Sequence, residues 1–262
     1  MRNLQDNLLH WNTMAAANPE VPILPPQPRA TVTGDRVAQL NSLFEVAFHA
    51  LSPVPIVPAL HHTAPSAAPA GIAHRQVRIY LRRPGDDPFV IGTILNDAGW
   101  ILTVAHPFAG SSESTEQFYV TGADLAEAKT PSVVYAPGPD NLALLRVDLD
   151  SQAALIGSPR FAHASEGDVI WVTAEDTAVQ RTVEEASREL RLGNETIYGN
   201  SLVTAALPLG EPFISGAPAV ADDGTIVALL YHRSADHQHS GFVEMRGLPA
   251  LLGYALQQEY LY

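Results

Sequence analysis

From about residue 75 to residue 246, the chain alternates short apolar runs with polar turns. The runs include QVRIYL, WILTVA, LALLRV, DVIWVTA and TIVALLYH, and each has the length of one β-strand. Residues 96–99 (NDAG) and 222–224 (DDG) are turn signals between such runs. Many short strands at close spacing are typical of a sandwich or barrel, so the pattern predicts an all-β fold for this region.

Two segments have helical periodicity instead, and a third is ambiguous. The apolar side chains of residues 35–51 recur at three- and four-residue spacing, which predicts an amphipathic helix. Residues 247–262 (GLPALLGYALQQEYLY) predict a second helix. Residues 177–194 (TAVQRTVEEASRELRLGN) fit either a long exposed hairpin strand or a helix, and we favour the strand. We expect the Leu40, Phe44 and Phe48 face of the first helix to dock on the strands or on a partner chain.

Composition narrows the possible partners. The chain has 28 acidic and 15 basic residues, for a formal charge of -13, which argues against nucleic acid or an anionic membrane as partner. The absence of cysteine excludes disulfides and cysteine catalysis. The first 20 residues lack the basic end and apolar core of a signal peptide, so we expect a cytoplasmic protein.

Three segments place polar residues next to apolar runs, in an order along the chain that suggests nucleophilic catalysis. GTILNDAGWILTVAHPF leads to His106, PGPDNLALLRVD places Asp140 and Asn141 before a strand, and EPFISGAPAV holds Ser215 among small residues. Each motif alone also fits an ordinary strand end, turn or Gly/Pro-rich loop. Together they offer a nucleophile, a base and a group that orients the base.

The chain resembles the trypsin-like serine peptidases, in particular the HtrA-like type without a PDZ domain, over about residues 75–256. The segments that carry the resemblance are GTILNDAGWILTVAH, DNLALLRVD, SGAPAVADDGTIVALLYH and GFVEM. It implies two six-stranded antiparallel β-barrels with the site between them, and the predicted C-terminal helix also suits the family. The N-terminal helix predicted from periodicity is an appendage to this fold. The expected boundaries are 1–71 for an N-terminal extension with one amphipathic helix and a Pro-rich linker, 72–150 for the first barrel, 155–246 for the second, and 247–262 for a terminal helix packed on the second barrel.

The resemblance also implies roles for individual residues. His106 is the expected base and Ser215 the nucleophile, with the backbone N–H groups of Phe213 and Ser215 as the oxyanion hole. The strand through Leu230, Tyr231 and His232 would line the substrate cleft. The resemblance therefore implies a bacterial serine endopeptidase that cleaves protein segments and needs no metal or organic cofactor.

Two departures from the family pattern bear on activity. The family aspartate directly precedes its apolar strand, but Asn141 holds that place and Asp140 comes one residue earlier, so either can face His106. Phe213 replaces the glycine of the oxyanion loop. We therefore expect a slow or conditionally activated enzyme, with a regulatory partner acting through the N-terminal helix. The alternative is a pseudopeptidase that serves as a binding or regulatory module.

A weaker alternative is a metal-binding module. His237 and His239 could face one way and bind a metal ion. A solvated loop beside the cleft is the simpler interpretation of such loose spacing.

Overall fold

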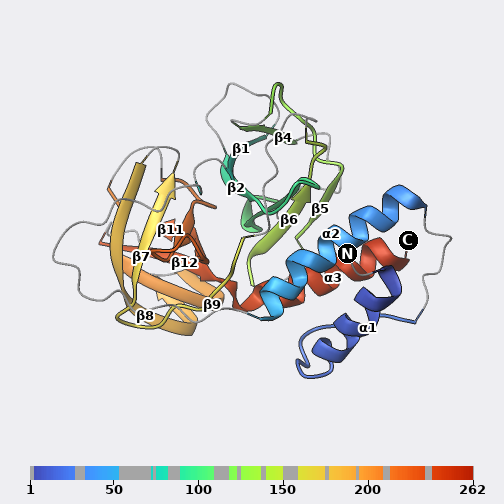
Figure 1. Cartoon of the computed structure of the whole chain (residues 1–262). Helices are drawn as coiled ribbons and strands as arrows, with labels where there is room; N and C mark the ends of the chain where they lie inside the picture. Colours follow the sequence, from blue (N-terminus) through green and yellow to red (C-terminus); the bar gives the residue numbers. More distant parts are fainter. Residues whose placement is uncertain are drawn as a thin grey trace.

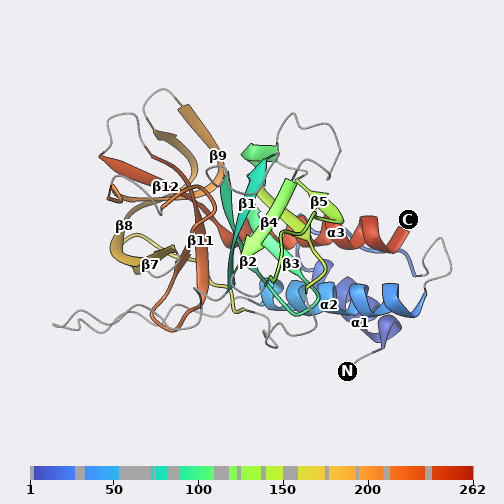
Figure 2. The same cartoon turned by 90° about the horizontal axis from the view of Figure 1, so that it is seen from above.

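The computed structural model describes residues 3–26, 33–52, 72, 75–81, 89–108, 118–122, 125–136, 140–149, 159–174, 177–192, 195–208, 213–233 and 238–261. Two β-structures and a group of helices lie in a row, with the β-structure of the first half of the chain in the middle (Figure 1, Figure 2). The prediction of an all-β, trypsin-like double-barrel fold with helices at both ends is confirmed.

The first β-structure, called here the first sheet, has six strands in the order β4-β1-β2-β3-β6-β5. β5 is one edge of this sheet, and the segment that leads into it lies against β4, the other edge. Lys129 forms an antiparallel bridge with Val120 of β4, and Val133 pairs with Arg146 of β6. The sheet is therefore a half-barrel whose edges approach one another. Its strands are β1 (Gln76–Leu81), β2 (Val90–Ile94), β3 (Trp100–Val104), β4 (Phe118–Gly122), β5 (Val133–Tyr135) and β6 (Leu142–Arg146).

The second β-structure, the second barrel, is closed in the order β10-β11-β12-β9-β8-β7. The ambiguous segment 177–192 is a strand, as predicted, and forms a long hairpin with β9. Its many polar and β-branched residues suit a ribbon with one solvated face. The strands are β7 (Val169–Ala174), β8 (Thr177–Leu192), β9 (Glu195–Ala205), β10 (Pro218–Val220), β11 (Ile226–Arg233) and β12 (His239–Glu244).

The helices differ from the prediction in two respects: the number of helices in the N-terminal extension and the packing of the terminal helix. The N-terminal extension has two helices, not one: α1 (Leu4–Ala15) precedes α2 (Gly34–Leu51). Trp11 of α1 is fully buried, and its ring packs edge-on against Phe44 of α2. The terminal helix α3 (Leu248–Leu261) packs mainly on α2 and β6, rather than on the second barrel as expected.

The position of α3 follows from its apolar face, because α2 and α3 bury their apolar faces against each other and against the first sheet. Leu40 and Phe44 of α2 are buried there, as predicted. Within the described part of the chain, none of the helices has the length and apolar character required to cross a bilayer.

Candidate active site

His106 and Asn141 are brought together by neighbouring strands of the first sheet. β3 pairs with β6 in a register that places Val104 opposite Leu142, so the residues just beyond the two strand ends meet. His106 opens a short 3₁₀ turn, η2 (His106–Phe108). Its backbone N–H donates to Oδ1 of Asn141 over 2.7 Å, and Nδ2 of Asn141 lies 3.4 Å from Nδ1 of the His106 ring. Of the two residues that the sequence left open, Asn141 is therefore the one that faces His106.

The backbone of Asn141 suits this position. Its φ is 51°, in the left-handed region where asparagine and aspartate occur more often than other non-glycine residues. Its carbonyl accepts the backbone N–H of Ala105 over 2.8 Å. The side chain thus enters the site from the residue that directly precedes β6.

Asp140 lies elsewhere. Its side chain packs directly on Gly247, where an added Cβ would approach the Asp140 Cβ to 2.5 Å. Gly247 ends the 3₁₀ turn η4 (Met245–Gly247) that leads into α3. Burial raises the pKa of the Asp140 carboxyl above its ordinary value, and the negative charge of Glu20 adds to this effect. Asp140 is thus a carboxyl at the junction with α3 and not the partner of His106.

The orientation of the Asn141 amide determines the tautomer of His106. Because Oδ1 accepts the backbone N–H of His106, the group that faces the ring is the Nδ2 amide, which only donates hydrogen bonds. Nδ1 must then act as acceptor, and the proton of a neutral imidazole is left on Nε2. A general base in a serine-histidine pair needs the opposite tautomer, with a free lone pair at Nε2.

Ser215 is held in a tight turn between the two β-structures. The Ala217 N–H donates to the Ile214 carbonyl over 3.2 Å, and Gly216 lies at the third position of this turn with φ of 87°. A type II turn requires glycine there. Space requires it as well, because a Cβ on Gly216 would approach the carbonyl oxygen of Ile91 to 1.9 Å.

The first sheet contacts this turn through β2. The Ile91 N–H donates to the carbonyl of Ser215 over 2.8 Å, and the Thr103 hydroxyl donates to the carbonyl of Ile91 over 2.7 Å. Thr103 lies on the strand that leads to His106. The main chain around Ser215 is thus connected by hydrogen bonds to the strand that positions the histidine.

Tyr231 contacts both Ser215 and His106. The Ser215 hydroxyl donates to the carbonyl of Tyr231 over 2.9 Å, and a hydroxyl that donates its single proton there does not donate it to an imidazole. The Tyr231 and His106 rings meet edge to face, with centroids 4.8 Å apart and an interplanar angle of 86°.

A β-bulge explains how Tyr231 reaches this position. β11 and β12 pair Leu230 with Phe242 and His232 with Gly241, so Tyr231 is one extra residue in β11 relative to β12. Bulges redirect side chains near functional sites. No signal in the sequence predicts this bulge, because TIVALLYH contains neither glycine nor proline.

The other predicted site residues occupy distinct surroundings. Leu230 is buried, and its carbonyl accepts the Gly216 N–H over 2.7 Å, so its strand does adjoin the serine turn. Phe213, in the place of the expected glycine, is only 6% exposed and packs in the core of the second barrel. The His232 side chain lies outside the described part of the structure.

The histidines of the proposed metal loop are only partly described. His237 lies outside the described residues, while the ring of His239 is 3.7 Å from a carboxylate oxygen of Glu184. Over the described residues, no three histidine, aspartate or glutamate side chains gather as metal ligands would.

The fold is similar to that of solved serine proteases. The protease domain of MamO from Magnetospirillum magneticum matches with a TM-score of 0.51 at 18% identity, over 65% of this chain and 91% of that one. The Rv3671c protease from M. tuberculosis, in its inactive form, matches with a TM-score of 0.51 at 17% identity, over 77% and 98%. The HtrA-type protease AlgW with a decapeptide matches with a TM-score of 0.51 at 16% identity, over 71% and 65%. No protein-family model and no curated protein matches the sequence. The fold is therefore that of the trypsin-like and HtrA-type serine proteases.

Proposed function

We propose that this protein is a serine endopeptidase whose resting site is unreactive and becomes reactive when a protein substrate or partner reshapes it. The observation that carries the proposal is the convergence on Tyr231. The base candidate His106 touches its ring, the nucleophile candidate Ser215 bonds its carbonyl, and Asn141 lies beside His106. The protease fold supports the same conclusion. The Rv3671c protease, solved in an inactive and an active form, supports the idea of two states.

In the reactive state, the Ser215 hydroxyl transfers its proton to Nε2 of His106 as its oxygen attacks the substrate carbonyl. The resulting oxyanion accepts hydrogen bonds from backbone N–H groups of the turn, for which Ser215 and Phe213 are the candidates. His106 then returns the proton to the leaving amine. Ser215 then carries the acyl group of the substrate as an ester. A water molecule, deprotonated by His106, attacks this ester, and the proton returns to Ser215 as the carboxylic acid product leaves.

Two changes separate the resting site from this reactive state. The Ser215 hydroxyl must exchange the Tyr231 carbonyl for His106, and the His106 proton must move from Nε2 to Nδ1. A substrate that lies as an extended strand along β11 supplies binding free energy for the first change. The second change is opposed by the Asn141 amide, so we expect low turnover even with substrate bound.

The test is labelling of the full chain by a fluorophosphonate probe, which forms a covalent bond with an activated serine. We expect slow labelling of the parent and none of Ser215→Ala, read by intact-mass spectrometry. Labelling that survives in Ser215→Ala would assign the reaction to another residue and refute the proposal.

A second candidate function, a pseudopeptidase that binds protein segments without cleaving them, is favoured by one observation. The Asn141 amide donates toward Nδ1 of His106, which is the arrangement of an inactive pair. Absence of labelling in the parent and also in Asn141→Asp would establish this second candidate over the first.

A further inference from the structure

A groove runs along α2, away from the candidate active site. It extends from Gly34 to Phe48, about 21 Å at the helical rise of 1.5 Å per residue, and has a volume of about 1010 Å³. Its other walls come from α1, from the turn between β2 and β3, and from the end of β6. Its volume is at the upper end of the range for small-molecule sites, about 300–1,000 Å³, and its length of about 21 Å suits an elongated occupant.

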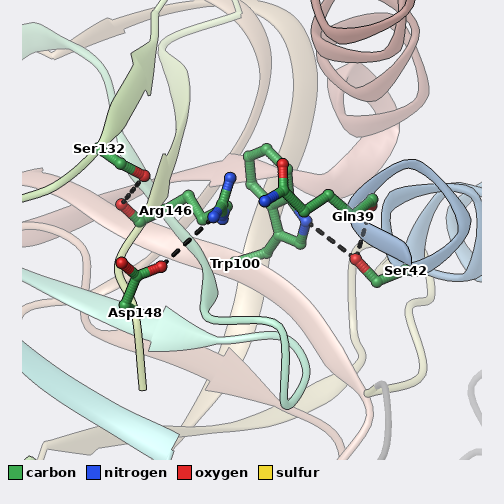
Figure 3. A network of polar contacts seen from close by, with 6 residues as sticks. All are labelled: Gln39, Ser42, Trp100, Ser132, Arg146 and Asp148. Atoms are coloured by element: carbon green, nitrogen blue, oxygen red, sulfur yellow. Dashed lines mark hydrogen bonds and ion pairs between the residues drawn. The ribbon is translucent and has the colours of Figure 1, made fainter. Parts of the chain in front are cut away.

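The lining of the groove is mixed: its apolar residues, called here the apolar floor, lie among polar residues that include more carboxylates than cations. Apolar side chains line it along its length, and three exposed carboxylates, those of Glu45, Asp97 and Asp148, stand beside them. The guanidinium of Arg146 lies 3.3 Å from Asp148 and over the ring of Trp100 (Figure 3). The apolar lining residues are Val37, Ala38, Phe48, Ala98 and Leu149.

The walls are held together by specific contacts. Nδ2 of Asn7 in α1 donates to Oδ1 of Asn41 in α2 over 2.8 Å, and the His10 ring packs edge-on against Phe48 at 4.5 Å. On the other side, the Trp100 indole donates to the Ser42 hydroxyl over 3.3 Å (Figure 3). An occupant therefore finds a groove that is already formed, which lowers the entropic cost of binding.

We propose that this groove is the docking site for a basic, amphipathic segment of a partner protein, bound as a helix alongside α2. Apolar side chains at helical spacing would lie on the floor, as in other helix-in-groove complexes. Lysine or arginine side chains beside them would meet Glu45 and Asp97, and would compete with Arg146 for Asp148. A chain with a net charge of -13 also attracts a basic segment over long range.

The groove and the candidate active site share two strands. Arg146, which lines the groove, pairs with Trp100 at one end of the β3–β6 ladder, while Val104 pairs with Leu142 at the end that holds His106 and Asn141. A docked segment therefore contacts the strand pair that positions the candidate base. We expect docking to change the reactivity of Ser215, an expectation that rests on the proposed function.

The test titrates the full chain with a fluorescent 18-residue peptide of leucines at helical spacing and lysines elsewhere, at about 0.15 M salt. Two matched peptides carry glutamate for every lysine or serine for every leucine. The groove variant combines Glu45→Gln, Asp97→Asn and Asp148→Asn. The control variant combines Glu127→Gln, Glu166→Gln and Glu185→Gln, three exposed residues outside the groove with the same total change of charge.

We expect the leucine–lysine peptide to bind and the matched peptides to bind at least tenfold more weakly. The groove variant should weaken binding at least tenfold and the control variant less than threefold. Ala38→Arg, an exposed position on α2, should weaken it at least tenfold, and Gln180→Arg on β8 should not.

Equal weakening by the groove and control variants would mean attraction by net charge alone and would overturn the docking site. Equal binding of the serine peptide would overturn the role of the apolar floor. A peptide that binds in the groove without changing fluorophosphonate labelling would leave the docking site established and overturn its link to Ser215. Binding is measured without catalysis, so its failure is distinct from failure of the proposed function.

Discussion

The two halves of the candidate site restrain their reactive groups in different ways. In the first sheet, the restraint is chemical: an asparagine lies where a carboxylate would hold the histidine, and its amide faces Nδ1. In the second barrel, the restraint is conformational: a bulged strand offers the Tyr231 carbonyl to the Ser215 hydroxyl. A partner or substrate can relieve the second restraint by moving the chain, but only a proton shift or a substitution relieves the first.

This difference has a consequence for regulation. A hydrogen bond between a serine and a carbonyl contributes about 0.5–1.5 kcal/mol, which substrate binding easily exceeds. The tautomer effect is larger, about 10⁴ in rate for an asparagine in the place of the aspartate of a trypsin-like enzyme. The Asn141–His106 contact should therefore limit the maximum rate. The hydrogen bond between Ser215 and Tyr231 should determine how strongly that rate depends on a bound substrate or partner.

The largest effect is expected for Asn141→Asp. A carboxylate at this position accepts the proton of Nδ1 and frees the lone pair of Nε2, so fluorophosphonate labelling should accelerate roughly 10²- to 10⁴-fold. Aspartate tolerates the positive φ of residue 141 nearly as well as asparagine. The double variant with Ser215→Ala is the control and should not be labelled. An unchanged labelling rate would show that Asn141 does not limit the site.

A smaller gain is expected for Phe213→Gly. The buried Phe213 ring anchors the chain just before Ser215 to the core of the second barrel, so glycine should release the turn and raise basal labelling about tenfold. The same change should lower the free energy of unfolding by about 3–5 kcal/mol, because a buried phenylalanine is lost. Phe213→Leu keeps an apolar anchor and should retain most of the stability with slow labelling. Faster labelling of the leucine variant would argue against anchoring.

Tyr231→Ala tests the contact between the two halves. Aromatic pairs contribute about 0.5–1.5 kcal/mol, so loss of the ring should change labelling only about two- to tenfold. The clearer readout is NMR of His106, whose ring protons should lose the shift caused by the Tyr231 ring. Tyr231→Phe keeps the ring and should keep that shift. Identical His106 spectra in the parent and the alanine variant would disprove the contact in solution.

Asp140→Asn should leave the labelling rate unchanged, because the Asp140 side chain packs on Gly247 and not on His106. Its effect should appear in stability instead. The raised pKa of Asp140 means that the folded state binds the proton more tightly than the unfolded state, so stability falls as pH rises from about 3.8 through the raised value. The variant lacks this loss, and its melting temperature should gain on the parent over that range. A loss of labelling would instead return Asp140 to the site.

The apolar periodicity was sufficient to predict most elements. The strand runs and the buried Leu40 and Phe44 face of α2 follow from local spacing. Spacing left residues 177–194 open between a strand and a helix, and the favoured strand is the one that forms. It missed α1, because its hydrophobic face is short and contains polar residues such as the buried Asn7. It also misplaced α3, because an apolar helix face does not indicate which of two β-structures will cover it.

The sequence by itself determined the fold class and the order of His106, Asn141 and Ser215, because hydrophobic spacing and turn chemistry are local properties of the chain. The sequence could not decide between Asp140 and Asn141. Both residues directly precede a strand, and the local backbone conformation determines which of the two side chains points toward His106. The tertiary structure decided this through the β3–β6 register and the positive φ of Asn141. It likewise decided the partner of the Ser215 hydroxyl, since the bulge at Tyr231 arises from the mismatch between two paired strands and not from the residues of β11 alone.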